Sequence, residues 1–185
     1  MKQTMEQQIV ISGVGGQGVL FVTRLLAEAA IAGGRSVITA ETHGMAQRGG
    51  TVLSHLKIGH WSSPMIRRGQ ADGILSLKAE TMAAHSHFLK PSAWAVVNAT
   101  ATDDMEGGDL RSPVAADAIA ERIANSRAVN LIILGAALGR AERNPAEVSL
   151  FCTFDDIIAV VESRLHDRPH MRDRAIEALN AGRSA

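Results

Sequence analysis

The sequence predicts an α/β protein with a three-layer α/β/α architecture, a mixed, mostly parallel Rossmann-like sheet and a helical C-terminal part. A short apolar strand, residues 8–12, runs into a Gly-rich turn and then into an amphipathic stretch, residues 18–32. A second strand follows at residues 36–41, so these elements form a right-handed parallel β-α-β unit. A third strand, residues 51–58, follows too soon for a helical crossover and is expected to run antiparallel to a neighbour.

The remaining elements follow from the spacing of apolar residues. In the first helix they recur every three or four positions, which gives it one buried face, and a pair of glycines ends it. Buried strands are expected at residues 71–78 and 93–98, with a helix, residues 79–89, between them. Residues 99–112 are small, polar and acidic, which predicts a loop.

The C-terminal part is predicted to be helical. Apolar patterns indicate helices at residues 116–123 and 130–141, and a weaker one at 172–181. Between these, Thr153 and Asp156 are spaced as a capping box and mark the start of another helix. The sequence contains no internal repeat and no linker, so residues 1–185 are expected to form a single domain.

Composition excludes several classes of protein. The 185 residues carry 19 basic and 19 acidic side chains, no Tyr and 3% aromatics, which argues against a nucleic-acid partner. No apolar run approaches the ~20 residues of a membrane span, and the polar N-terminus is unlike a signal peptide. Cys152 is the single cysteine, so this chain builds neither a disulfide nor a cysteine-ligated iron–sulfur cluster. We expect a cytoplasmic protein without membrane contact.

The Gly-rich turn is the first candidate site. Gly13, Gly15 and Gly18 satisfy Gly-x-Gly-x-x-Gly between a strand and a helix, where free N–H groups and the helix dipole favour an anion. Gly16 adds a further flexible position, and Gln17 carries an amide for a ligand or for the neighbouring loop. A tight turn that packs closely and binds nothing is the alternative.

Glu41 makes a dinucleotide site conceivable. It lies 23 residues after Gly18, near the end of the second strand, as the ribose-binding acid of a Rossmann enzyme does. A self-sufficient NAD-dependent oxidoreductase is therefore one hypothesis. Against it, the second strand continues into a loop, residues 42–50, and not into a helix.

That loop is the second candidate site, and it follows a strand that is expected to neighbour the first. Arg48 offers a planar five-donor fork for a phosphate or carboxylate. Alternatively, Arg48 pairs with Glu41 and orders the loop. The histidines of the chain are too scattered for a metal site, and no catalytic residue is expected. The candidate residues in this loop are His43, Gln47, Arg48, Gly49 and Gly50.

Four segments carry a resemblance to a known family. Residues 13–18, 41–50, 71–72 and 130–135 resemble the gamma subunit of 2-oxoacid:ferredoxin (acceptor) oxidoreductases, and are most similar to the small (beta) subunit of indolepyruvate oxidoreductases. The resemblance implies a non-catalytic subunit of a complex that oxidatively decarboxylates a 2-oxoacid to an acyl-coenzyme A. The isolated chain is then expected to be inactive.

The resemblance also implies where the cofactors lie. Thiamine diphosphate and iron–sulfur clusters would belong to partner subunits, and ferredoxin or another electron acceptor would interact indirectly. Coenzyme A would bind at the surface of this chain, through the glycine turn and the second loop. An isolated chain is also expected to form a homodimer through the surface that otherwise meets its partners.

Overall fold

Six strands in the described part of the chain form one sheet in the order β2-β3-β1-β4-β5-β6. The computed structural model describes residues 5–43, 50–100 and 111–185. Strand β3 runs antiparallel to both of its neighbours, β2 and β1, while β1, β4, β5 and β6 are successively parallel, which confirms the mixed, mostly parallel sheet. The strands are β1 (Gln7–Val14), β2 (Val37–His43), β3 (Thr51–Ile58), β4 (Ala71–Ser76), β5 (Leu89–Asn98) and β6 (Arg111–Val114).

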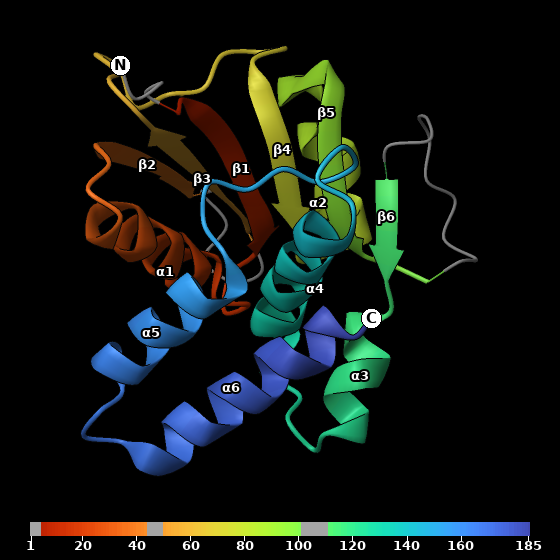
Figure 1. Cartoon of the computed structure of the whole chain (residues 1–185). Coiled ribbons are helices and arrows are strands. Elements are labelled where there is room, and N and C mark those ends of the chain that lie inside the picture. The colour runs from red at the N-terminus through yellow and green to blue at the C-terminus, as the bar shows by residue number, and fades with distance from the viewer. Residues whose placement is uncertain (1–4, 44–49, 101–110) are drawn as a thin grey trace.

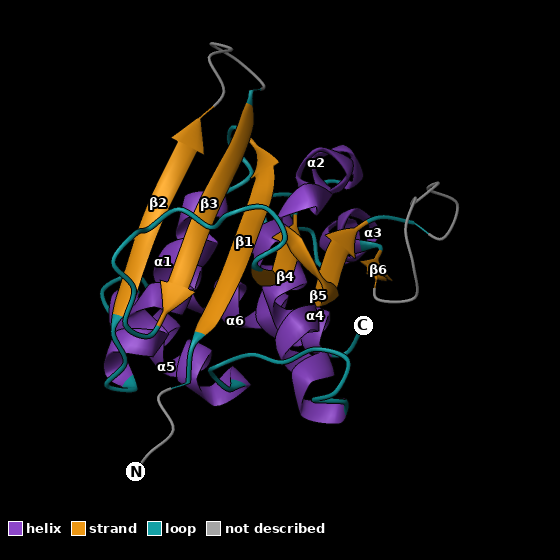
Figure 2. Cartoon of the chain, turned by 90° about the horizontal axis from the view of Figure 1, so that it is seen from above, coloured by secondary structure: helices purple, strands orange, loops and turns teal. Residues whose placement is uncertain are grey.

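The helices cover both faces of this sheet, which confirms the three-layer architecture, but they do so unequally (Figures 1 and 2). Helices α1 and α4 pack directly on one face, with α3, α5 and α6 packed against them. The other face carries α2 and the segment 59–70, which crosses β3 and β1 in Figure 2. The helices are α1 (Val19–Ala32), α2 (Ala79–His85), α3 (Ala116–Arg122), α4 (Val129–Arg143), α5 (Phe154–Arg164) and α6 (Pro169–Arg183).

Alternation along β1 divides the interior into two cores. Ile9 and Ile11 point into the large core under α1 and α4, whereas Val10 points into a smaller core under α2. All three side chains are fully buried. Burial on both faces explains why β1 reads as a continuous apolar run.

Helix α4 is buried along most of its length and packs closely on α6. Gly135 of α4 lies against the carbonyl of Leu179, and Gly182 of α6 lies against the carbonyl of Ile132. A Cβ at either glycine would overlap that carbonyl, so the two backbones approach as only glycine allows. No helix in the described ranges is long and apolar enough to cross a bilayer.

Four elements differ from the sequence-based expectations, and one of them is β5, which begins at Leu89 and not at Ala93. Strand β6 lies at the end of the segment that was expected to be a loop. The helix expected at residues 79–89 ends at His85 and continues as a 3-10 turn, Ser86–Phe88, before β5. Helix α6 starts at Pro169, earlier than its apolar residues indicate, because proline fits the first helical turn.

The capping box at the start of α5 is confirmed. The Thr153 hydroxyl accepts a hydrogen bond from the Asp156 N–H at 3.2 Å, and the Thr153 N–H donates to the Asp156 carboxylate at 2.8 Å. Both bonds satisfy N–H groups that the first helical turn leaves without partners.

Candidate functional site

The Gly-rich turn joins the carboxyl end of β1 to the start of α1. Gly16 and Gly18 have φ angles of 91° and 81°, a region that favours glycine. A Cβ on Gly18 would also overlap the Asn130 side chain. Helix α1 has no side-chain cap and no acidic residue in its first turn, so its own side chains leave the positive end of the helix dipole uncompensated.

Gln17 is tied into the fold by both ends of its carboxamide. The Val14 N–H donates to the Gln17 side-chain oxygen at 2.9 Å, and the Gln17 amide donates to the Leu77 carbonyl at 3.3 Å. These bonds link the turn to the residue that follows β4. Gln17 therefore orders the turn through its side chain.

The two predicted glycine loops meet. The Gly15 N–H donates to the Gly50 carbonyl at 3.0 Å, at the edge of the sheet where β1 ends and β3 begins. Gly15 and Gly16 are exposed, and no atom lies within 4 Å of the position of a Cβ on Gly16. In contrast, a Cβ on Gly13 would lie 2.9 Å from Gln17, so Gly13 serves close packing.

The remaining predicted residues are only partly described. Glu41 is exposed on β2 and pairs in register with Ser54 of β3. Strand β3 therefore lies between β2 and β1, and the expectation that the two loops follow neighbouring strands is wrong. The predicted residues that lie outside the described part are Gln47, Arg48, Gly49 and the side chain of His43.

Two asparagines at the same edge of the sheet complete the support of the turn. The Asn130 side chain, which is 7% exposed, donates to the Gly18 carbonyl at 3.4 Å. Asn98, at the end of β5, donates to the Leu77 carbonyl at 3.2 Å and accepts from the Ala116 N–H at 3.1 Å. The sequence offered one signal for these two residues. Asn98 ends one apolar run and Asn130 begins another, so both were placed at the ends of predicted elements.

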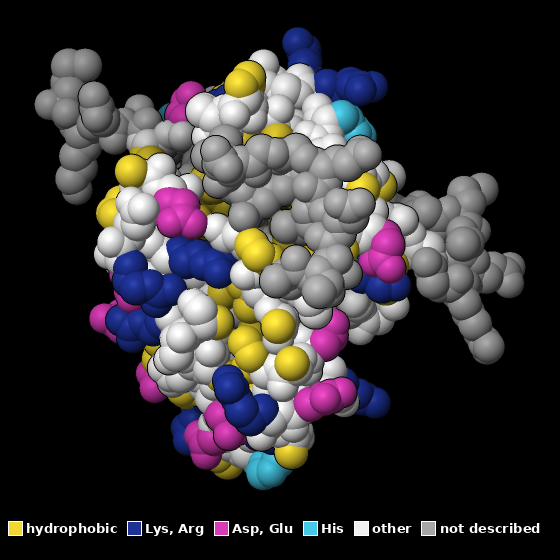
Figure 3. Space-filling model, turned by 90° about the vertical axis from the view of Figure 1, so that its right-hand side faces the viewer, with side chains coloured by type: hydrophobic (Ala, Val, Ile, Leu, Met, Phe, Trp, Pro, Cys, Tyr) yellow, Lys and Arg dark blue, Asp and Glu magenta, His cyan; other side chains and the backbone are white. Residues whose placement is uncertain are grey.

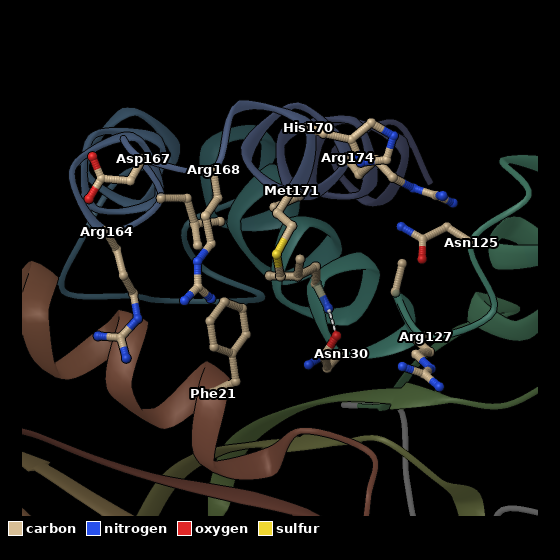
Figure 4. A pocket seen from close by; sticks show the side chains of 14 residues that line it. Phe21, Asn125, Arg127, Asn130, Arg164, Asp167, Arg168, His170, Met171 and Arg174 are labelled. Atoms are coloured by element: carbon tan, nitrogen blue, oxygen red, sulfur yellow. Dashed lines mark hydrogen bonds between the residues drawn. The ribbon is translucent and has the colours of Figure 1, made fainter.

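The described residues also form an open groove of about 870 Å³ that the sequence did not predict. It lies between the start of α1, the start of α4, and the junction of α5 with α6 (Figure 4). Of the predicted site residues in the described ranges, none lines it. The residues that carry its chemistry are Phe21, Arg127, Arg164, Arg168, Met171 and Arg174.

The sequence alone could have indicated some of the arginines of this groove, but not all of them. Arg164, Arg168 and Arg174 belong to a dense run of basic residues near the C-terminus. Arg127 lies far away in the sequence, and Phe21 belongs to the first helix. The fold alone brings these two beside the others.

Titratable groups gather on the opposite face, under α2 and the segment 59–70. His55 is fully buried, and burial lowers its pKa, with smaller contributions from His85 and Lys57. Burial also lowers the pKa of His85, whose ring lies 2.6 Å from the Ser12 hydroxyl. Both imidazoles are therefore held neutral. No group of three potential metal-ligating side chains occurs among the described residues.

Cys152 is not a reactive thiol. It is 6% exposed, and burial raises its pKa to about 12. A thiol with this pKa is protonated at neutral pH and is a poor nucleophile and metal ligand. It packs as a small apolar side chain in the large core.

Comparisons with known proteins agree with one another. Residues 8–185 match the family model described as pyruvate ferredoxin/flavodoxin oxidoreductase. Indolepyruvate oxidoreductase subunit IorB of Archaeoglobus fulgidus is 36% identical over 155 residues, which is 73% of this chain and 77% of that protein.

Two solved structures share the fold. The keto/oxoacid ferredoxin oxidoreductase gamma subunit of Geobacter sulfurreducens has a TM-score of 0.74 and 23% identity, with 96% of each chain covered. The 2-oxoglutarate:ferredoxin oxidoreductase of Magnetococcus marinus, with 2-oxoglutarate, coenzyme A and succinyl-CoA bound, has a TM-score of 0.77 and 18% identity. The match covers 97% of this chain but 30% of that one.

Proposed function

Because the chain belongs to the pyruvate ferredoxin/flavodoxin oxidoreductase family, we propose that it is the non-catalytic gamma subunit of a thiamine-dependent 2-oxoacid oxidoreductase. The complex would decarboxylate a 2-oxoacid oxidatively and form an acyl-coenzyme A. This chain would hold the subunits together and present a surface to coenzyme A.

The residues of this chain fit such a division of labour. An iron–sulfur cluster needs several thiolates, and the chain has one cysteine, which is buried and has a raised pKa. The clusters and thiamine diphosphate would therefore be held by partner subunits. When bound there, thiamine diphosphate supplies the stabilised carbanion that decarboxylation of a 2-oxoacid requires.

The hydrogen bond from Gly15 to Gly50 is the observation that carries the proposal. It joins the glycine turn to Gly50, at the place where β1 ends and β3 begins. The carboxyl ends of parallel strands are a common place for ligands in α/β sheets. Of the N–H groups in this turn, those of Val14, Gly15 and Gln17 are used within the protein. Gly16, whose Cβ position is open, is where a phosphate or a partner backbone would approach.

Reconstitution tests the function directly. The chain should co-purify with a thiamine-bearing subunit from the same organism, and turnover of a 2-oxoacid should require both. Turnover by the isolated chain would contradict the proposal. A coenzyme A titration of the free chain and of the complex separates a coenzyme-binding surface from one that only docks a partner.

A matched pair of variants tests the glycine turn itself. Gly16 and Gly34 flank α1, both have positive φ, and neither has an atom within 4 Å of its Cβ position. Asparagine tolerates positive φ best among the other residues, so Gly16→Asn and Gly34→Asn should both fold. We expect only Gly16→Asn to weaken association or coenzyme A binding, by roughly tenfold, which corresponds to about 1.4 kcal/mol. If the two variants bind the partner subunit and coenzyme A with equal affinity, Gly16 is not part of the site.

A further inference from the structure

The groove between α1, α4, α5 and α6 combines an apolar wall with a basic rim. Phe21 of α1 and Met171 of α6 face each other across it, and Met171 is 53% exposed (Figure 4). Arg127, Arg164 and Arg168 are exposed on its rim. Apolar surface rimmed by polar side chains is typical of sites where proteins interact.

Two of the arginine side chains at the groove have no partner in the part of the chain that the structure describes. Arg164 forms an ion pair with Glu28, and the Arg174 guanidinium donates to the Ala124 carbonyl. Among the described residues, the guanidinium groups of Arg127 and Arg168 make no hydrogen bond or ion pair, although the backbone of Arg168 is bonded to Leu165.

The groove itself offers them little negative charge. Asp167 is the one carboxylate among the described lining residues, and it pairs with His166 at 3.0 Å. Its side chain points away from Arg168 (Figure 4).

The backbone adds to the positive potential. Helices α4 and α6 both begin at the groove, and neither has a side-chain cap or an acidic residue in its first turn. Their positive dipole ends therefore reinforce the arginines. Figure 3 shows a face on which basic and acidic side chains are intermixed, and Arg183 pairs with Glu142 at 2.8 Å.

We propose that this groove docks an acidic segment of a partner subunit, with an apolar side chain seated between Phe21 and Met171. The inference rests on the proposed function, which supplies the partner. The arginines come from different elements, and their guanidinium groups point in different directions (Figure 4). One phosphate cannot satisfy such a spread, whereas carboxylates spaced along a polypeptide can.

Charge reversal tests the proposal in the complex. We would compare Arg127→Glu/Arg168→Glu with Arg67→Glu/Arg68→Glu, an exposed arginine pair in the segment 59–70 on the opposite face of the sheet. Both variants change the net charge equally. The affinity of each for the thiamine-bearing subunit is measured at low and at high salt.

The groove variant should bind at least roughly tenfold more weakly at low salt and lose part of its salt dependence, because its carboxylates would repel an acidic partner. The control should bind like the wild type. Arg127→Gln/Arg168→Gln, which adds no repulsion, should fall between them, and thermal melts verify that all variants are folded.

The outcomes separate the two proposals. If the wild type binds no thiamine-bearing subunit, the proposed function fails. If the wild type binds and both double reversals bind equally well, the docking inference alone is overturned. It is also overturned if association survives while the groove variant loses calorimetric binding of inorganic triphosphate, because the groove would then be a small-anion site.

Discussion

Gln17 illustrates how one residue can suit two roles that a sequence does not distinguish. An amide inside a Gly-rich turn is typical of a ligand-binding loop, yet here it bridges Val14 and Leu77. Leu77 also accepts a hydrogen bond from Asn98. The role of Gln17 depends on where β4 and β5 end, which no local pattern around the turn records.

His55 should make stability depend on pH. Burial holds the folded-state pKa of His55 below its usual value of about 6.5, so the unfolded chain binds the proton more readily. The stabilisation is complete above pH ~6.5 and is lost as the pH falls towards the folded-state pKa. The free energy of unfolding should therefore drop below pH ~6.5, by up to about 1.4 kcal/mol per pH unit for this one group. Urea unfolding at a series of pH values measures it.

His55→Gln identifies the source of that slope. Glutamine does not titrate, and its oxygen can replace the imidazole nitrogen that accepts from the Ile66 N–H. We expect the slope to flatten in His55→Gln and to persist in His60→Gln, an exposed control. His85 acts in the same direction, so a residual slope should remain. An unchanged slope in His55→Gln would assign the effect to other groups.

Elements with a strong local signal could be predicted from the sequence. The helical periodicity of α1 and the capping box of α5 are properties of neighbouring residues, and both are confirmed. Strand β6 was missed because it has four residues, one of them Pro113, and gains its hydrogen bonds only from β5. Local patterns predict elements that neighbouring residues stabilise, but not a short strand such as β6, which forms only because it pairs with β5.

The α4–α6 contact predicts an inverted substitution effect. At an exposed position in a helix, alanine is more stabilising than glycine by about 1 kcal/mol. At Gly135 and Gly182, however, the new Cβ would overlap a carbonyl of the facing helix. We expect each Gly→Ala variant to lower the free energy of unfolding by roughly 1–3 kcal/mol.

Gly15→Ala is the control for that experiment. The nearest atom to its Cβ position is 3.8 Å away, and its φ is not positive. Urea unfolding measures the free energy of unfolding of the three variants. It thereby compares two positions where the new Cβ overlaps a carbonyl with one position where it has room. Stability of Gly135→Ala or Gly182→Ala at or above the wild-type level would mean that the helices separate without cost.

The order of the strands decides between the functional hypotheses at the level of the whole molecule. The sequence correctly placed a glycine turn at the carboxyl end of β1, and Gly15 and Gly50 do meet. It could not reveal that β3 is inserted between β1 and β2. Strand order depends on how the whole sheet assembles, and the groove depends on helices that are distant in sequence. Local patterns in the sequence record neither.

This insertion predicts that the chain does not bind NADH as a dinucleotide enzyme does. Glu41 pairs with Ser54, which pairs with Ile11, so Glu41 lies two strand spacings from β1, roughly 10 Å. A ribose-binding acid needs the strand adjacent to the glycine turn. Calorimetry should detect no saturable NADH binding, and Glu41→Gln should leave the heats unchanged. Stoichiometric NADH binding that Glu41→Gln abolishes would instead mean that the dinucleotide reaches across β3, and the dehydrogenase hypothesis would replace the subunit proposal.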